Sequence, residues 1–145
     1  MDFLSQLFSN RILWVSVFAC FLAQFIKVFT GSEKRIDFSR IFMSGGMPSS
    51  HSSFVTSLST LVGIYKGFDS IEFAICIVFA LIVMYDASGV RRAVGKQAAI
   101  LNKIVKDLQN KKHVEHETLK ELVGHTPKEV IFGAILGIVV GVIMA

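Results

Sequence analysis

The stretch SGGMPSSHSSFVTSLSTLVGIY, residues 44–65, begins as a polar decapeptide and continues directly into an apolar segment of helical length. Its first ten residues contain one methionine as the only apolar side chain, beside two glycines, a proline, a histidine and five serines. Farther along, small hydroxyl side chains lie on a single helix face at Ser49, Ser53, Thr56 and Thr60. Such a stripe is typical of closely packed helices in a lipid bilayer. The stretch therefore predicts a membrane-embedded helix over 49–65 that begins in a polar loop.

The composition of the whole chain indicates an integral membrane protein. Of its 145 residues, 52% are hydrophobic and only 18% are charged, below the roughly 25% of soluble domains. The length suits one domain, so we treat residues 1–145 as a single membrane-embedded unit. The net charge of +4 is concentrated in patches, which favours anionic lipids or phosphate as partners and argues against nucleic acid.

Three further apolar runs lie on either side of the opening stretch. Residues 12–29 approach the length of about 20 residues that a helix needs to cross a bilayer, and residues 71–85 are shorter. Residues 129–145 carry a double GxxxG pattern, formed by Gly133, Gly137 and Gly141. This pattern allows another helix to approach closely, and we interpret it as packing within the chain. The oligomeric state stays open, with a homodimer among the alternatives.

Residues 86–127 form a long charged stretch between the last two apolar runs. Its middle, QAAILNKIVKDL, repeats apolar residues with helical periodicity at Ile100, Leu101, Ile104, Val105 and Leu108. We predict an amphipathic helix here, outside the membrane or on its surface. The predicted fold class is therefore all-α: a polytopic membrane helical bundle with an additional amphipathic cytoplasmic helix. Four helices are membrane-embedded in this prediction, over roughly 12–30, 49–65, 71–86 and 128–145.

The distribution of charge predicts how this bundle is oriented. Short turns make consecutive membrane helices alternate in direction, so the segments 31–48 and 86–127 emerge on one face. Nearly all basic residues lie on that face, whereas the opposite face has only Arg11 and Lys66. The positive-inside rule then assigns the basic face to the cytoplasm, and we expect a bacterial cytoplasmic membrane. The polar sequences SGGMPSSHS, DASGVRR and GHTPKE all meet on this cytoplasmic face.

The first of these polar sequences fits a phosphate-binding turn. Gly45 and Gly46 allow the backbone to approach a ligand closely, and Pro48 suits the first turn of the helix that follows. The backbone N–H groups of Ser49, Ser50 and the next residue would then be unpaired at a helix N-terminus, which attracts anions. The alternative interpretation is a well-capped helix that simply enters the membrane.

His51 favours the binding site over the simple cap, because a titratable ring at the end of a membrane helix is a functional candidate. In the second polar sequence, Asp86 lies at the exit from an apolar run and is followed closely by Arg91 and Arg92. Arginine binds phosphate oxygens with two parallel hydrogen bonds. The alternative is a salt bridge between Asp86 and one arginine, together with contacts to lipid head groups.

The third polar sequence places His125 four residues before Glu129, one helical turn away. A carboxylate at that spacing can hold a histidine ring in one tautomer. The competing interpretation is a capping box, in which Glu129 bonds the backbone N–H of Thr126; both contacts can coexist. His113 and His116 lie in a polar connector without further ligands, so we predict no metal site.

Three segments together resemble a known family: GGMPSSHSS, VMYDASGVRRAVGKQAAILN and LKELVGHTPKEVIFGAILG. They are similar to the divergent branch of the type-2 phosphatidic acid phosphatases (PAP2), a set of small bacterial and plant membrane proteins. This branch is related to acid phosphatases and vanadium-dependent haloperoxidases. The resemblance covers nearly the whole chain. Pro48-Ser49-Ser50-His51 resembles the Pro-Ser-Gly-His motif of the wider superfamily, and His125 with Glu129 resembles its His-Asp pair.

The resemblance implies a phosphatase mechanism. His125 would attack phosphorus and form a phosphohistidine, Glu129 or Asp86 would orient its ring, and His51 would protonate the leaving alcohol and later activate water. The groups implied to stabilise the charged oxygens are Lys27, Arg91 or Arg92, and the amides near Gly46 and Ser49. Neither a metal nor another cofactor is implied. The expected substrate is a phosphate monoester or diphosphate of a lipid or polyprenyl alcohol.

Two other functions remain open on the sequence. In the wider superfamily an Arg-Pro pair follows the lysine, and a Ser-Arg pair lies shortly before the second histidine. Here no Arg-Pro pair follows Lys27, and Arg91 and Arg92 lie far upstream of His125. These departures favour a non-catalytic membrane protein that binds phosphate or anionic lipid head groups. A small transporter or channel subunit is the third alternative, because a charge such as Lys27 within a membrane helix can line a path for ions.

Overall fold

The computed structural model describes residues 2–30, 46–109 and 124–145. Within these ranges every regular element is a helix and no strand occurs, which confirms the predicted all-α class. The helices are α1 (Phe3–Phe8), α2 (Arg11–Lys27), α3 (Ser50–Lys66), α4 (Ile71–Ser88), α5 (Val90–Gln109) and α6 (Pro127–Ile143). Helices α2, α3, α4 and α6 match the four predicted apolar helices, and α5 contains the predicted amphipathic segment. The short helix α1 was not predicted.

Most of these helices begin where a polar side chain can replace the missing backbone partners. A side-chain oxygen accepts the backbone N–H of the third helical residue at Asn10, Ser49, Ser70 and Thr126. Pro127 occupies the first turn of α6, as predicted, but Pro48 does not occupy the first turn of α3. That prediction was wrong, because Ser49 is the cap and Pro48 therefore lies before the helix.

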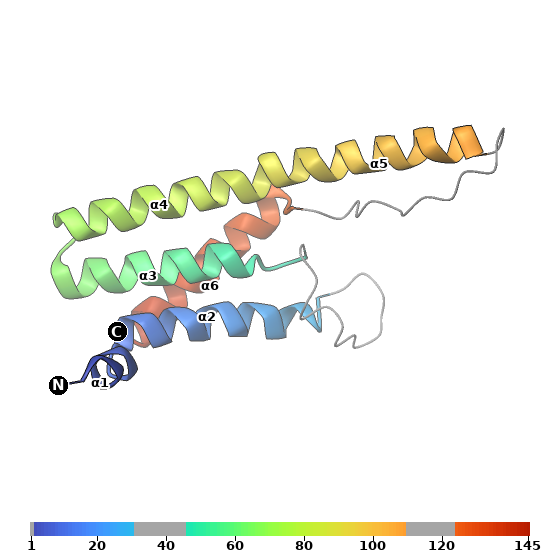
Figure 1. Ribbon diagram of the computed structural model, residues 1–145. Helices are drawn as coiled ribbons and strands as arrows, with labels where there is room; N and C mark the ends of the chain where they lie inside the picture. The colour runs from blue at the N-terminus through green and yellow to red at the C-terminus, as the bar shows by residue number, and fades with distance from the viewer. Residues whose placement is uncertain (1, 31–45, 110–123) are drawn as a thin grey trace.

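Helix α3 is the centre of the bundle and packs against α2, α4 and α6. In Figure 1, α2, α3 and α4 run side by side, while α6 crosses against α3 and α2. The two chain ends lie at the same end of the bundle as the α3–α4 turn (Figure 1). Helix α5 continues beyond the opposite end, in nearly the same direction as α4.

The closest helix contact joins the two stripes of small residues that the sequence revealed separately. The facing pairs are Gly133 with Ser49, Gly137 with Ser53 and Thr56, and Gly141 with Thr60. A side chain at Gly133 or Gly137 would overlap backbone atoms of α3, so only glycine allows this approach. The prediction of packing within the chain is confirmed. The glycine stripe is therefore covered by α3 and does not supply a dimer surface.

Hydroxyl groups of α3 also bond to its neighbours on two sides. The Ser53 hydroxyl donates to the Ala19 carbonyl of α2 at 3.0 Å, and the Thr56 hydroxyl lies 3.1 Å from the Ala134 carbonyl of α6. In a bilayer such bonds stabilise helix association, because lipid cannot replace a missing partner. Hydroxyl groups and small side chains thus hold α2, α3 and α6 together.

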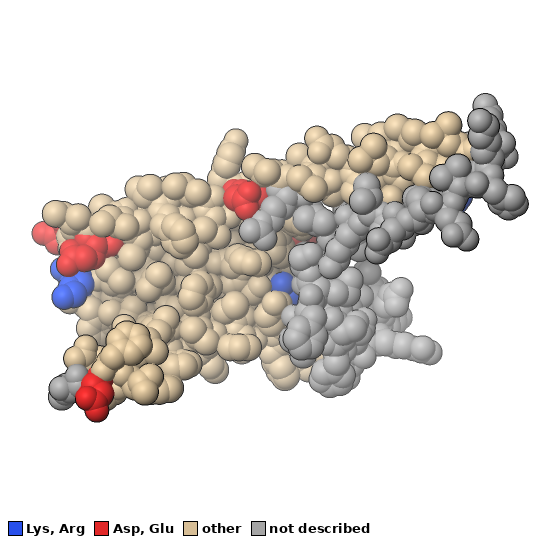
Figure 2. Space-filling model, viewed as in Figure 1, with Lys and Arg blue, Asp and Glu red and all other residues tan. Residues whose placement is uncertain are grey.

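Large apolar side chains cover the outside of the bundle. Phe21 is 68% exposed and Ile71 is 76% exposed. Charged side chains in view gather at the two ends of the bundle, with an uncharged band between them (Figure 2). Among the described residues, only the stretch 71–106, which joins α4 to most of α5, is long and apolar enough to cross a membrane by length and composition. The predicted set of four membrane-embedded helices is therefore not confirmed, since α2, α3 and α6 have 17 residues each.

Candidate active site

The three polar sequences meet at the end of the bundle opposite the chain termini. The Ser49 N–H donates to the Glu129 carbonyl at 3.0 Å, which joins the start of α3 to the start of α6. The His125 N–H donates to the Ala87 carbonyl at 2.9 Å, which joins the segment before α6 to the last turn of α4. These bonds bring together segments that are far apart in the sequence, as the alternating topology predicts.

Two glycines at positive φ shape the segments that enter this region. Gly46 has φ +84° and Gly124, which precedes His125, has φ +99°. Side chains other than hydrogen rarely tolerate this backbone region. A Cβ on Gly46 would also lie 3.9 Å from Cδ of Lys27, so the α2 lysine runs beside the turn before α3.

The two histidines face each other across the end of the bundle. Their ring centroids lie 6.3 Å apart, and the ring planes are inclined by 64°. His125 is only 4% exposed, whereas His51, in the first turn of α3, is exposed. One ring is therefore shielded and the other is accessible, at a separation that allows both to contact one small ligand.

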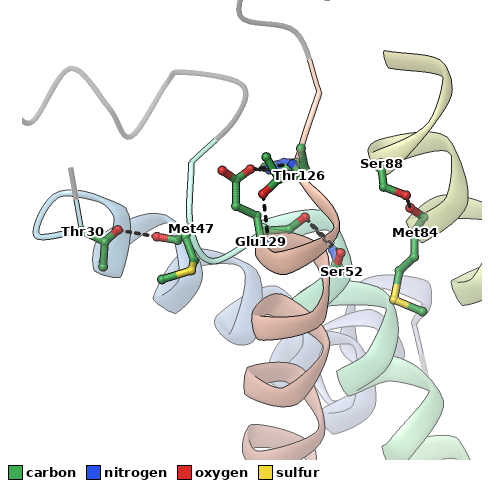
Figure 3. Close-up of polar contacts among 9 residues, drawn as sticks. Thr30, Met47, Ser52, Met84, Ser88, Thr126 and Glu129 are labelled. Atoms are coloured by element: carbon green, nitrogen blue, oxygen red, sulfur yellow. Dashed lines mark hydrogen bonds and ion pairs between the residues drawn. The ribbon is translucent and has the colours of Figure 1, made fainter. Parts of the chain in front are cut away.

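Glu129 serves both partners that the sequence suggested. Its Oε2 atom lies 3.1 Å from His125 Nδ1 and accepts the Thr126 N–H at 3.1 Å. The Thr126 hydroxyl accepts the Glu129 N–H at 3.4 Å, which completes the capping box (Figure 3). Because a carboxylate only accepts, His125 Nδ1 carries the proton of this bond. The lone pair of the neutral ring is thereby directed to Nε2.

The protonation of His125 depends on its burial. Burial lowers the pKa of His125 below its ordinary value, while the hydrogen bond to Glu129 acts in the opposite direction. The positive charge of Lys27 lowers the pKa of His125 further. The ring is therefore neutral at neutral pH, which is the form that can act as a nucleophile.

Lys27 ends α2 as a buried cation, with 4% of its surface exposed. Its charge interacts with Glu129 of α6. A buried ammonium is costly unless an anion accompanies it. This position beside Gly46 and His125 therefore suits a phosphate oxygen.

One predicted anion donor is already used by the fold. The expectation that the Ser49 N–H is unpaired was wrong, because the Glu129 carbonyl accepts it. The Ser49 hydroxyl likewise accepts the hydroxyl of Ser52 at 3.0 Å. The reason is the close contact at Gly133, which brings the second turn of α6 against the cap of α3. Ser50, the first residue of α3, is buried beside this cap.

The structure describes the remaining predicted site residues only in part. Asp86 is half-buried in the last turn of α4, one residue before the Ala87 carbonyl that holds His125. Arg91 and Arg92 lie in the first turn of α5. Their side chains fall outside the described part of the structure, and so do the whole residues Gly45, His113 and His116.

Two contacts at this end of the bundle could not be predicted from the sequence. The Thr30 hydroxyl donates to the Met47 carbonyl and ties the end of α2 to the turn before α3 (Figure 3). The Ala87 carbonyl anchors the backbone of His125. Both contacts use backbone oxygens, which every residue carries, so no residue pattern could have revealed them.

One end of this all-helical bundle thus holds a histidine bound to a carboxylate, a second histidine and a buried lysine. The model of the Divergent PAP2 family matches residues 8–140, and the chain belongs to this family. The "Uncharacterized membrane protein YuiD" of Bacillus subtilis (strain 168) is 44% identical in an alignment of 154 positions that covers 97% of each chain. No solved structure matches the chain. The family resemblance inferred from the three polar segments is confirmed.

Proposed function

We propose that this protein is a membrane phosphatase that hydrolyses a phosphate monoester or diphosphate of a lipid or polyprenyl alcohol. The observation that carries the proposal is the pairing of a buried neutral His125, held through Nδ1 by Glu129, with an accessible His51 ring at 6.3 Å. Membership of the Divergent PAP2 family supports it. The buried Lys27 ammonium beside this pair supplies the charge that a phosphate needs.

The proposed reaction has two steps. In the first, Nε2 of His125 attacks phosphorus, the bond from phosphorus to the alcohol oxygen breaks, and His51 gives its proton to the departing alcohol. In the second, His51 accepts a proton from water as the water attacks the phosphohistidine. Phosphate leaves, and the His125 ring returns to its neutral form. Glu129 acts as the orienting group throughout, because its bond to Nδ1 stabilises the charge on the ring.

Charge on the phosphoryl oxygens is balanced by protein cations and amides. Lys27 is the principal cation of the proposal, and the backbone around Gly46 lies next to its side chain. Arg91 or Arg92 would add a second cation from the start of α5, and Asp86 would support that arginine or the ring of His125. The proposed chemistry uses no metal and no other cofactor.

We infer that the bundle is embedded in a bacterial cytoplasmic membrane, with the site on the cytoplasmic side. The uncharged band in Figure 2, the exposed large apolar side chains, the stretch 71–106 and the similarity to a membrane protein of Bacillus subtilis support the membrane location. Helices of 17 residues are shorter than the bilayer core, and they fit a membrane when the bilayer thins locally or flanking polar residues reach up to the head groups. A site at the membrane boundary suits a substrate whose phosphate is in water and whose tail is in lipid.

The test is phosphate release by the purified full-length protein in detergent, with EDTA present and a panel of lipid and polyprenyl phosphates. We expect release from at least one substrate, and its loss in both His125→Ala and His51→Ala. A radiolabelled substrate should leave an acid-labile label on the wild-type chain and none on His125→Ala. Lys27→Met should also abolish release, whereas Lys66→Met at the far end of α3 is the matched control and should not.

A non-catalytic phosphate or lipid head-group binder is the second candidate. The pairing of the Ser49 N–H with the Glu129 carbonyl favours it, because one donor expected for the transition state is already occupied. Binding of lipid phosphate that needs Lys27 but yields no free phosphate would support this candidate and reject the phosphatase. If neither binding nor release occurs and vesicles show ion flux, the transporter alternative replaces both.

A further inference from the structure

Helix α5 carries an apolar face that is largely uncovered. Among the described helices, α5 packs mainly against α4. Side chains about half exposed or more on this face are Val90, Val94, Ile100, Leu101, Ile104 and Leu108. In a water-soluble environment a contiguous apolar face of this kind marks an interaction surface. It is separate from the candidate active site.

The polar face of α5 is basic. Val90, Leu101 and Leu108 recur near one side of the helix, whereas Lys96 and Lys103 recur seven residues apart on the opposite side. The whole helix has five basic residues and one acidic residue. Apolar residues on one face and lysines on the other characterise helices that lie in the membrane interface.

Two partners could cover this apolar face, a second copy of α5 or an anionic membrane surface, and charge distinguishes between them. A second copy of α5 would place one strongly basic helix against another, which repels. An anionic membrane surface attracts every lysine on the helix and accepts the apolar face at the boundary of head groups and acyl chains. The electrostatics therefore favour lipid.

The connection to α4 places α5 near such a surface. Helix α4 begins the helical stretch 71–106, and α5 follows it after a single residue, Gly89. In the structure α5 leaves Gly89 in nearly the same direction as α4. For α5 to lie along the surface the chain must bend at Gly89, whose φ −101° and ψ −84° are outside ideal helix values. Helix α5 thus starts at the end of the bundle that carries His125, whose backbone bonds to Ala87.

We propose that α5 binds the anionic surface of the membrane, with its apolar face in the interface and its lysines among anionic head groups. The inference does not depend on phosphatase chemistry, and its test measures no turnover. The probe is the full-length chain in lipid nanodiscs, one chain per disc, with an environment-sensitive fluorophore on a single cysteine. Replacing Cys20 and Cys76 by serine provides the background for labelling.

The fluorophore is attached at Ile104→Cys on the apolar face and, as the matched control, at Lys103→Cys on the polar face. In discs containing phosphatidylglycerol we expect blue-shifted emission and quenching by lipid-borne quenchers at position 104 only. Discs of phosphatidylcholine alone should reduce the shift, and so should Lys96→Gln combined with Lys106→Gln. A label at Leu101→Cys repeats the measurement if the first variant does not fold.

Three results would overturn the proposal. Water-like emission at both labelled positions would mean that α5 projects into solution. An equal shift in zwitterionic and anionic discs would remove the electrostatic basis. A shift that appears only in discs with two chains would identify a second copy of the protein as the partner.

Discussion

The substitution Gly133→Ala tests the link between helix packing and the candidate active site. A Cβ at this position would lie 3.0 Å from the Ser49 nitrogen and overlap the Ser49 carbonyl oxygen still more closely. Ordinary contact begins at 3.4 Å, so α3 and α6 must separate by at least about 0.4 Å, and by more to clear the oxygen. Both clashing atoms belong to the backbone and cannot rotate away.

The size of the effect follows from these contacts. Overpacking of this kind costs about 1–3 kcal/mol. The Ser49–Glu129 bond of 3.0 Å spans the same contact, and its loss adds about 1 kcal/mol. Alanine returns about 1 kcal/mol through its better helix propensity, which leaves a net loss of roughly 1–3 kcal/mol. Because reacting groups tolerate little displacement, phosphate release should fall about 10-fold or more.

Gly141→Ala is the matched control in the same glycine stripe. Its Cβ would meet the Thr60 side chain at 3.0 and 3.1 Å, and a backbone oxygen only at 3.3 Å, so smaller shifts relieve the contact. The propensity gain is the same, so the difference between the two variants isolates the clash. Unfolding in mixed detergent, followed by circular dichroism, should show Gly133→Ala as less stable than Gly141→Ala by about 2 kcal/mol. Equal stability and equal activity would refute the packing argument.

Four other predictions concern the side chains of Glu129, His125, Lys27 and Thr56. Glu129→Gln keeps a capping side chain but removes the charge, so the rate should fall about 100-fold while the helix start survives. Burial already lowers the pKa of His125, so activity should persist below pH of about 6.5 before protonation removes the nucleophile; Glu129→Gln should move this acid limb to still lower pH. Lys27→Met should weaken phosphate binding about 100-fold without loss of thermal stability, because it removes a buried charge. Thr56→Val should cost about 1 kcal/mol, since its hydroxyl is shared between the Ser52 carbonyl of α3 and the Ala134 carbonyl of α6.

Each of these predictions has a control. Glu72→Gln lies at the opposite end of the bundle and should leave the pH profile unchanged. Thr60→Val removes a hydroxyl that bonds only within α3, so it should cost less than Thr56→Val. An acid limb above pH of about 6.5, or a clear drop in melting temperature for Lys27→Met, would contradict the account of the buried site.

The sequence predicted much of the fold because its signals are local. The starts of α4 and α6 follow from polar caps before apolar runs, and the capping box around Thr126 was read directly from four consecutive residues. The spacing of His125 and Glu129 also fixed their contact, because residues four apart on a helix are neighbours. The use of the Ser49 N–H was not predictable, since its acceptor lies eighty residues away in the sequence.

The residue order by itself determined which segments are helical, which faces carry small side chains and which polar groups stand at helix ends. Periodicity and capping depend on neighbours within one or two turns, so they are written in short stretches. The tertiary structure decided that the glycine stripe of α6 meets the hydroxyl stripe of α3. It also decided that two distant histidine rings come within 6.3 Å and that Lys27 is buried beside them. The first outcome depends on how closely α6 can approach α3, which is set by the absence of a Cβ at the α6 glycines that meet α3, a helix far away in the sequence. The other two also join residues that are distant in the sequence, so no short stretch contains them.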